Sequence, residues 1–471
     1  MMMSSQRACL VSVALAAVAA CSTAPTAQSV LSDASAAMGA GQLRSIEYSG
    51  TGLQFSLGQS PHPDAPWPKF NAKSYTRSVN YEIPQSRQVL VRTQAENPPH
   101  GGGQQPLIGE QTQTLLTNLS APWETEMEIW ITPHGFLRAA AANRATLAQQ
   151  TVDGKTYNVL SYLAQKKYKV SGYINREKMV EKVETWIDNP VLGDMLVEAT
   201  YSGYKDFGGV MFPTKIIQKQ GGYPVLDVDV ADVKPNAPVT IDPPAAPAPV
   251  AVTTEKAADG VWYLTGGSHH SAVIEFNDHI VVVEGPQSEA RASAVIAEAK
   301  KLVPNKPIRY LVNTHHHWDH SGGLRTFVAE GATIVTHQIN QPYYEKTFAL
   351  PHTLNPDRLA KAKTAAKFET LTDRKTLTDG ARVLELYHVA GSGHNDGIIL
   401  AYLPQDRILI EADLFTPPAN PATPPPEPRS PYAVNLGENL DRLKLNYVVV
   451  LPLHGRRSDR AELLKFVTPK K

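Results

Sequence analysis

Residues 314–323, with the sequence THHHWDHSGG, constrain the fold more than any other segment of the chain. They place four histidines and one aspartate within the six positions 315–320, directly after the apolar run IRYLVN at 308–313. That run predicts a buried strand, so the histidines belong to the loop that leaves it. Functional groups of α/β proteins gather in the loops beyond strand ends. The segment therefore predicts an α/β domain with a site at the end of a strand.

The chain around this segment alternates between strand-like and helix-like patterns from residue 260 onward. Three short apolar runs between residues 260 and 285 predict strands, and the amphipathic helix that follows has Ala292 and Leu302 on its apolar face. Further strands are predicted at ATIVTH, RVLELYHV, GIILAYLP, RILIEADLF and YVVVLPLHG, before a last helix near 457–467. This alternation is typical of an α/β domain.

The motif itself has the spacing of a metal site. A loop leaving a strand can point His315 and His317 to one side, and Asp319 and His320 to another. Neighbouring imidazoles and a carboxylate suit two adjacent divalent metals. Because the motif offers no thiolate, zinc, manganese and iron all remain open.

Three more candidate ligands follow separate predicted strands. They are His394 in GSGHNDG, Asp413 in IEADLF and His454 in LPLHG. A histidine cluster on a solvated turn is the alternative to a metal site. Three additional donors at other strand ends favour the metal site, because strand ends on one edge of a sheet come together in space.

With these residues in place, the region from about residue 260 to the C-terminus resembles the metallo-β-lactamase superfamily, whose hallmark is H-x-H-x-D-H after a strand. The resemblance implies an αββα sandwich with a two-metal site at one edge. It also implies a first metal held by His315, His317 and His394, a second held by Asp319, His320 and His454, and Asp413 as the bridge between them. Two departures are Glu284 in VVVEG, where members commonly carry Asp, and Leu453, where Gly is frequent.

Two such cations, about 3.5–4 Å apart, can share one hydroxide and polarise the carbonyl that it attacks. The sequence thus predicts a metal-dependent hydrolase with two divalent ions, Zn²⁺ or else Mn or Fe, that cleaves an ester, lactone or thioester by a metal-bridging hydroxide. Asp319 is the predicted catalytic proton carrier, because it stands beside the hydroxide. Asp413 favours these substrates, since β-lactamases of the superfamily usually carry Cys or Ser at the bridging position.

Two alternatives stay open. One is a β-lactamase or other amide hydrolase of the same superfamily, and the other is a non-catalytic periplasmic ligand carrier or sensor. The intact set of seven ligands favours an enzyme, because a decayed domain would be expected to lose ligands. A Ser-His-Asp hydrolase finds no support, since the chain has no G-x-S-x-G sequence.

Candidate substrate contacts are His269 and His270, on a turn in GGSHHSAV that could overhang the metals, and Arg456, which could bind a substrate carboxylate. Plain surface exposure is the alternative for all three. The Pro-rich residues 416–431 predict a stiff loop near the mouth of the pocket.

The part of the chain before residue 236 has a different pattern. Alternation in KYKVSGYIN, KVETWIDN and LDVDVADV predicts an antiparallel, β-rich domain over residues 30–235, with a short helix at ATLAQQ. It faintly resembles the curved sheets of periplasmic lipoprotein-carrier proteins, and it assembles no catalytic set. A Pro- and Ala-rich linker over 236–253 separates it from a catalytic domain at 254–471.

Residues 1–21 read as a secretory signal, because their apolar run at 8–20 is shorter than the roughly 20 residues that cross a bilayer. VAAC at 18–21 resembles a lipobox, in which Cys21 would be acylated, and ordinary cleavage nearby is the alternative. The predicted location is therefore the periplasm or the outer membrane of a Gram-negative bacterium.

Charge indicates the class of partner. The chain has 45 Lys and Arg against 45 Asp and Glu, so no overall basic field exists to hold a nucleic acid. We expect a small-molecule substrate, with membrane attachment only through an acylated Cys21. The sequence leaves the oligomeric state open.

Overall fold

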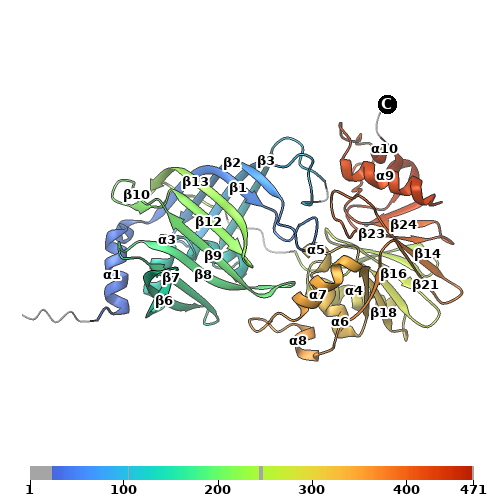
Figure 1. Cartoon of the computed structure of the whole chain (residues 1–471), viewed down its shortest axis with the longest axis horizontal. Helices are drawn as coiled ribbons and strands as arrows, with labels where there is room; N and C mark the ends of the chain where they lie inside the picture. Colours follow the sequence, from blue (N-terminus) through green and yellow to red (C-terminus); the bar gives the residue numbers. More distant parts are fainter. Residues whose placement is uncertain (1–23, 104, 243–247, 469–471) are drawn as a thin grey trace, which may run out of the picture.

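The computed structural model describes residues 24–103, 105–242 and 248–468. The predicted signal peptide and its Cys21 lie outside the described residues. Figure 1 shows a curved sheet built from the first half of the chain beside a layered domain built from the second half. Among the described residues, no helix has the length and apolar character needed to cross a membrane.

The N-terminal domain is one eleven-stranded sheet in which every neighbouring pair is antiparallel, in the order β4-β3-β2-β1-β13-β12-β9-β8-β7-β6-β5. Its strands are β1 (Ser45–Phe55), β2 (Lys69–Asn80), β3 (Gln85–Gln94), β4 (Gln111–Asn118), β5 (Thr146–Val152), β6 (Lys155–Ala164), β7 (Tyr168–Ile174), β8 (Val180–Asn189), β9 (Gly193–Ser202), β12 (Lys215–Gln220) and β13 (Tyr223–Pro235). The short strands β10 (Lys205–Asp206) and β11 (Met211–Phe212) pair separately. This confirms the predicted β-rich domain.

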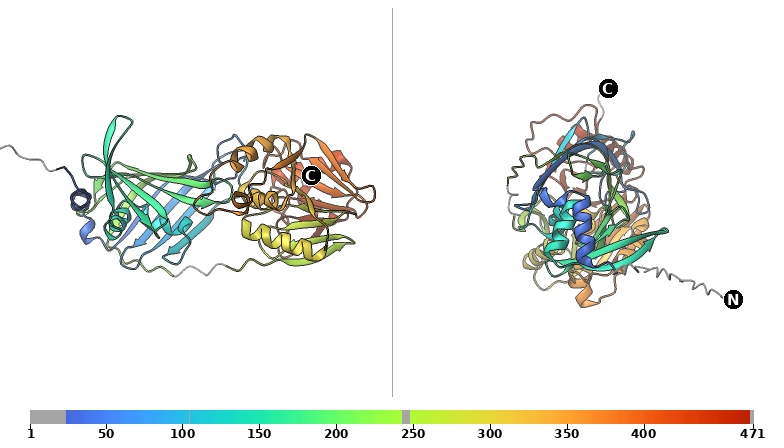
Figure 2. Two further views of the ribbon diagram at one scale, coloured as in Figure 1. Left: turned by 90° about the horizontal axis from the view of Figure 1, so that it is seen from below. Right: turned by 90° about the vertical axis from the view of Figure 1, so that its left-hand side faces the viewer.

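Three helices pack against this sheet: α1 (Ala27–Ala37), α2 (Trp123–Trp130) and α3 (Pro133–Ala142), with a 3₁₀ turn at Ala40–Gln42 after α1. Helix α2 contacts β3 and β4 near one edge of the sheet and also β8 in its other half. The sheet therefore curls around the helices, as Figure 2 shows. Large apolar side chains such as Trp123, Phe136 and Phe212 are fully buried in between.

The predicted helix at ATLAQQ is wrong, because these residues belong to strand β5 at the edge of the sheet. The segment Thr146–Val152 is largely exposed, and it pairs along its whole length with β6. Its residues have ordinary helix propensity, which this antiparallel pairing overrides. Because this solvent-facing edge strand has no apolar alternation, its sequence pattern did not predict a strand.

The C-terminal domain contains two sheets. The first has the order β14-β15-β16-β17-β18-β19-β20, and the second β21-β22-β23-β24-β25-β26. The strands are β14 (Thr253–Ala258), β15 (Val261–Thr265), β16 (Ser271–Glu275), β17 (Ile280–Val283), β18 (Ile308–Val312), β19 (Thr333–His337), β20 (Lys367–Leu371), β21 (Arg374–Thr378), β22 (Val383–His388), β23 (Ile399–Leu403), β24 (Ile408–Glu411), β25 (Val449–Pro452) and β26 (Ser458–Asp459).

Helices cover the outer faces of both sheets. They are α4 (Glu289–Leu302), α6 (Leu324–Glu330), α7 (Gln341–Phe348), α8 (Arg358–Ala362), α9 (Pro431–Leu443) and α10 (Arg460–Val467), with a 3₁₀ turn at Gln338–Asn340. The short helix α5 (Trp318–Ser321) lies apart from these faces, and its Trp318 packs against the core of the N-terminal domain. One apolar cluster lies between the sheets, a second lies under α4 and α6, and a third lies under α9 and α10. The αββα sandwich is thus confirmed.

Strand chemistry explains where the site forms. Strands β17 and β24 are mostly apolar and are buried on both faces, and β18 is buried at its carboxyl end, at Leu311 and Val312, as expected for strands in parallel pairs covered by two layers. Their carboxyl ends therefore meet at one edge of the sandwich, where polar loop residues can collect. Helix α5 begins there, next to the N-terminal domain in Figure 1.

Candidate metal centre

Four loops bring the seven predicted ligands together. The loop from β18 into α5 carries His315, His317, Asp319 and His320; His394 follows β22; Asp413 follows β24; His454 follows β25. The apolar strands before these loops anchor each donor at the same edge of the sandwich. The side chains form two clusters whose donor atoms lie within 4.8 Å of one another.

The first cluster contains His315, His317, His394 and Asp413. Nε2 of His394 lies 3.3 Å from Nε2 of His315 and 3.0 Å from Oδ2 of Asp413. His317 has the opposite orientation, because its Nε2 is hydrogen-bonded outside the cluster and its Nδ1 has no hydrogen-bond partner among the described residues. Buried donor atoms that converge in this way, among them the unpartnered Nδ1 of His317 and both carboxylate oxygens of Asp413, are what an ion-binding cage requires.

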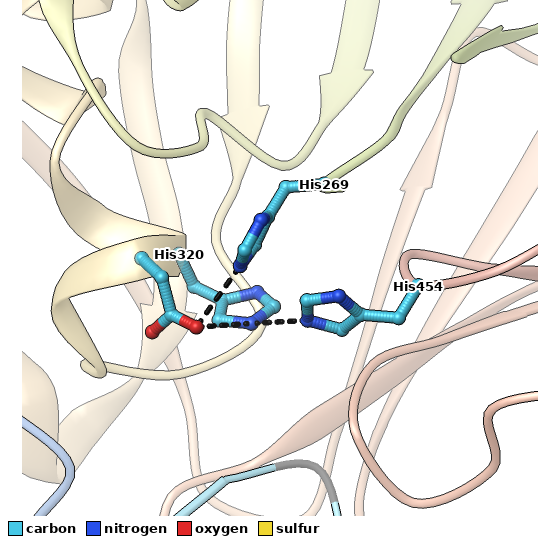
Figure 3. Close-up of side chains that lie close together, drawn as sticks. His269, His320 and His454 are labelled. Atoms are coloured by element: carbon cyan, nitrogen blue, oxygen red, sulfur yellow. Dashed lines mark hydrogen bonds and ion pairs between the residues drawn. The ribbon is translucent and has the colours of Figure 1, made fainter. Parts of the chain in front are cut away.

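The second cluster contains His320, His454 and Asp319, and it adds His269. Nε2 of His454 lies 3.0 Å from Nε2 of His320, and Nε2 of His269 lies 2.9 Å from Oδ2 of Asp319. Figure 3 shows the rings of His269, His320 and His454 converging. The sequence predicts His269 as a candidate substrate contact, and the structure places it among these donors.

Asp413 lies between the two clusters. Its Oδ2 faces His394 and His315, and its Oδ1 is 2.7 Å from Nε2 of His454 and 3.2 Å from Nε2 of His320. Asp413 is fully buried and has a φ of 64°, a left-handed conformation that is uncommon for a residue with a Cβ. Such strain persists where surrounding structure over-determines it, which is frequent at functional sites.

Outer partners fix the orientation of the rings. Glu284 is buried below the clusters and accepts hydrogen bonds from Nδ1 of His320, at 3.0 Å, and from the amide of Asn313, at 3.1 Å. Nδ1 of His454 donates to the carbonyl of Ser268 at 3.0 Å. Glu284, the departure noted in the sequence, thus supports the ligand loop through its carboxylate.

The electrostatics keep His315, His317 and Asp413 in ligand form, whereas the carboxylates of Asp413 and Asp319 outweigh burial and raise the pKa of His320 well above its usual value. Burial lowers the pKa of His315 to about 4 and that of His317 well below its usual value, so both rings are neutral near pH 7. Burial opposes ionisation of Asp413, but the neighbouring His320 and His454 outweigh it and hold the pKa of that carboxyl well below its usual range. Neutral imidazole and ionised carboxylate are the forms that bind divalent metals.

The donor chemistry fits divalent metal ions. Each cluster combines imidazole nitrogens with carboxylate oxygen, a set that suits zinc and also manganese or iron. One shared carboxylate is enough to join the two positions, and Asp413 presents one oxygen to each side. These clusters could therefore hold metal ions.

The structure does not bring the other two candidate substrate contacts into the clusters. The ring of His270 contacts the hydroxyl of Tyr263 at 2.6 Å and the carbonyl of Gly267 at 3.1 Å. The guanidinium of Arg456 pairs with the carboxylate of Glu462. Substrate contact by His270 and Arg456 stays a prediction.

Sequence reasoning missed two residues of the N-terminal domain, Gln59 and Ser60. The amide Nε2 of Gln59 donates to Oδ1 of Asp319 at 2.7 Å, and the carbonyl of Ser60 accepts from Nε2 of His317 at 2.9 Å. The surrounding sequence LGQSPHPD has no pattern that points to a site, so no signal could have found them.

Comparison with protein families matches residues 264–454 to the model described as the metallo-beta-lactamase superfamily. The matched stretch contains every donor of both clusters, including His269.

One curated relative is the 2,4-dinitroanisole O-demethylase subunit alpha of Nocardioides sp. (strain JS1661). It is 25% identical over 173 residues, which are 36% of this chain and 48% of that protein. The chain thus spans about half the length of this relative.

Similar solved structures include metallo-beta-lactamases from two bacteria, each 19% identical to this chain. The Pontibacter korlensis structure covers 46% of this chain and 97% of its own, with a TM-score of 0.35. The Hirschia baltica structure covers 47% and 99%, with a TM-score of 0.36.

Proposed function

The C-terminal part of this chain belongs to the metallo-beta-lactamase superfamily, and we propose that it is a dinuclear metal-dependent hydrolase of an ester, lactone or thioester. One observation carries the proposal: the buried Asp413 carboxylate presents one oxygen to each cluster. A carboxylate in that position supplies charge and oxygen ligation to both sides without a thiolate. Two divalent cations held close together would polarise a carbonyl. They would also lower the pKa of water, so that hydroxide is available to attack the carbonyl near neutral pH.

Asp319 has the position expected of the proton carrier. Its side chain is 30% exposed, whereas His320 and His394 are 0% exposed and Asp413 is 1% exposed. A substrate must therefore approach from the side of Asp319. In the reaction, water adds to the carbonyl carbon, Asp319 accepts a proton from that water, and the leaving oxygen or sulfur takes the proton as its bond to carbon breaks.

The residues around the clusters, rather than the metals, should select the substrate, because a polarised carbonyl of any accessible class would react. Residues 416–430, between β24 and α9, are irregular, and the carbonyl of Pro418 accepts from Nε of Arg456 at 2.9 Å. This contact joins the segment to the loop that carries His454. Shortening this segment should change the preference among esters and lactones while metal content stays the same.

The decisive experiment is metal analysis of the purified protein together with a panel of ester, lactone, thioester, β-lactam and phosphodiester substrates. We expect two metal ions per chain and turnover of an ester, lactone or thioester. A β-lactam cleaved much faster than all of these would replace the proposal with a β-lactamase. Absence of bound metal and of any turnover would favour a ligand carrier.

A second candidate reaction rests on the curated relative. Because the similar protein is named a 2,4-dinitroanisole O-demethylase subunit, the panel should include 2,4-dinitroanisole, an aryl methyl ether. Turnover of this ether above that of every carbonyl substrate would make ether cleavage the preferred function.

We also propose that the protein is exported and anchored through an acylated Cys21, because the lipobox-like VAAC follows an apolar run. Mass analysis of the native N-terminus tests this, together with release from membranes on Cys21→Ser. An unmodified N-terminus at another residue would refute the anchor.

A further inference from the structure

The loop between β1 and β2, residues 56–68, reaches from the N-terminal domain to the metal centre. Figure 1 shows it beside α5. The backbone amide of Trp318 donates to the carbonyl of Gly58 at 3.2 Å, and that of Asp396 donates to the carbonyl of Pro61 at 2.8 Å. The loop is therefore fixed to two of the four loops that carry the donors.

The carbonyl of Ser60 is the partner of one candidate ligand. It accepts from Nε2 of His317 at 2.9 Å, although the two residues are separated by 257 positions. With Nε2 engaged, only Nδ1 of His317 is left to face the first cluster. Metal-binding histidines usually donate their other ring N–H to a carboxylate or a backbone carbonyl, which sets the tautomer and the ring orientation.

The amide of Gln59 has the same relation to the second cluster. It donates to Oδ1 of Asp319 at 2.7 Å and leaves Oδ2 facing His269. The side chain of Ser60 adds a third contact, since its hydroxyl lies 3.1 Å from Nε2 of His316. His316, the histidine of the motif that joins neither cluster, is thus used to hold the loop.

We propose that the loop of residues 56–68 is a structural part of the metal centre, in which the Ser60 carbonyl orients His317 and the Gln59 amide orients Asp319. Both are positioning residues, and the proposal rests on the proposed function. It gives the N-terminal domain a role in metal binding. A carrier domain joined only by the linker would have no reason to hydrogen-bond to residues of both clusters.

A second loop of the same domain supports the arrangement. The amide of Gly101 donates to the carbonyl of Gly393, next to His394, at 2.8 Å, and the hydroxyl of Tyr432 donates to the carbonyl of Gly101 at 2.8 Å. Two loops from adjacent hairpins of one sheet therefore contact the donor loops, which fixes the sheet against the metal centre at more than one point.

Gly58→Ala is the sharpest test of the Ser60 contact. Gly58 has a φ of +68°, and a Cβ built on it would lie 2.4 Å from the ring of Trp318, so alanine must push the loop and Trp318 apart. Gly109→Ala is the matched control, because Gly109 has a φ of +72° and nothing within 4 Å of the added Cβ. Both variants place alanine at a similar positive φ, and only the first forces the loop and the donor segment at Trp318 apart.

The readout is Co²⁺ binding to the full-length protein freed of metal. Loss of an outer hydrogen-bond partner typically weakens metal affinity by about 10–100-fold. We expect Gly58→Ala to weaken one of two Co²⁺ ions by about that factor, in competition with a chelator, and to change its visible absorption. Gly109→Ala should match the unaltered protein in both measurements.

Gln59→Ala tests the second contact without moving the backbone, and it keeps the test decisive if Gly58→Ala does not fold. We expect a weaker second ion and an altered Co²⁺ spectrum. Gln149→Ala, at an exposed position on β5, is the control and should change neither.

Co²⁺ affinities and spectra of Gly58→Ala and Gln59→Ala equal to those of the unaltered protein would overturn this inference and leave the proposed hydrolase intact. An unaltered protein that binds no Co²⁺ would instead refute the proposed function, and this inference with it.

Discussion

The two domains each bury a charged group, and they satisfy it in opposite ways. In the N-terminal domain, Arg77 donates to the carboxylate of Glu128 at 2.8 Å and to Ser86 at 3.0 Å, and Gln218 donates to the other oxygen of Glu128 at 2.8 Å. In the C-terminal domain, neither carboxylate oxygen of Asp413 has a hydrogen-bond partner among the described residues.

The difference distinguishes a structural ion pair from a candidate metal site. A buried charge is tolerated when a counter-charge and hydrogen bonds offset its desolvation. The protein itself supplies both to Glu128, through Arg77 and Gln218. Around Asp413 the protein supplies histidine ring nitrogens that also face one another. A bound cation would satisfy both these nitrogens and the carboxylate. A buried charged group therefore indicates a functional site only where the surrounding protein groups do not satisfy all of its hydrogen-bonding atoms.

Removing a donor from the metal centre should have the largest effect. His394→Ala should lose one metal ion and nearly all hydrolysis, a loss beyond the roughly 10–100-fold that follows removal of an outer partner. Metal analysis and turnover of the best substrate measure it. Gln149→Ala, at an exposed position on β5, is the control. Full metal content and activity in His394→Ala would show that the first cluster is not a metal site.

Breaking the structural ion pair should instead reduce stability. Arg77→Met leaves Glu128 buried without its counter-charge, so the free energy of unfolding should fall by about 3–5 kcal/mol. Denaturant unfolding measures this, and metal content of the folded protein should stay unchanged. Arg87→Met, an exposed arginine on the neighbouring strand β3, should change little. An equal loss in both variants would contradict the structural role of the pair.

The N-terminal domain should also lose stability in acid through His134. Burial lowers the pKa of this histidine from 6.5 to about 4. The unfolded chain therefore takes up a proton near pH 6.5, whereas the folded protein does so only near pH 4. The stabilisation is complete above pH 6.5 and falls as the pH is lowered toward 4, by about 3 kcal/mol.

Unfolding free energies at pH 7 and pH 4.5 test this in the unaltered protein and in His134→Gln. The variant should lose less stability between the two pH values, and His100→Gln should behave like the unaltered protein. The same acid sensitivity in His134→Gln would assign it to another group.

The smallest effect is expected at His269. Because Nε2 of His269 lies 2.9 Å from Oδ2 of Asp319 and supports that ligand through a hydrogen bond, His269→Ala should weaken the second metal ion by about tenfold, the lower end of the range for an outer partner. Chelator competition measures the affinity. His270→Ala is a close control, since the adjacent ring contacts Tyr263 and joins neither cluster. Equal weakening in both variants would show that His269 has no specific role.

Local sequence determined a large part of this picture. An apolar strand ends immediately before each of the loops that carry His315 and His320, Asp413, and His454. Each of these donors could therefore be placed at a strand end without knowing the fold. The same reasoning failed for strand β5, where pairing along an edge decides the conformation and leaves no apolar pattern in the sequence.

Only the tertiary structure decided which distant residues complete the metal centre. His269 lies 50 positions from Asp319, and Ser60 lies 257 positions from His317 in another domain. Their contacts depend on how loops and domains pack, because a hydrogen bond forms only when both atoms come within about 3 Å. The periodicity of apolar residues predicts which face of a helix or strand is buried, but it does not identify the residues that pack against that face.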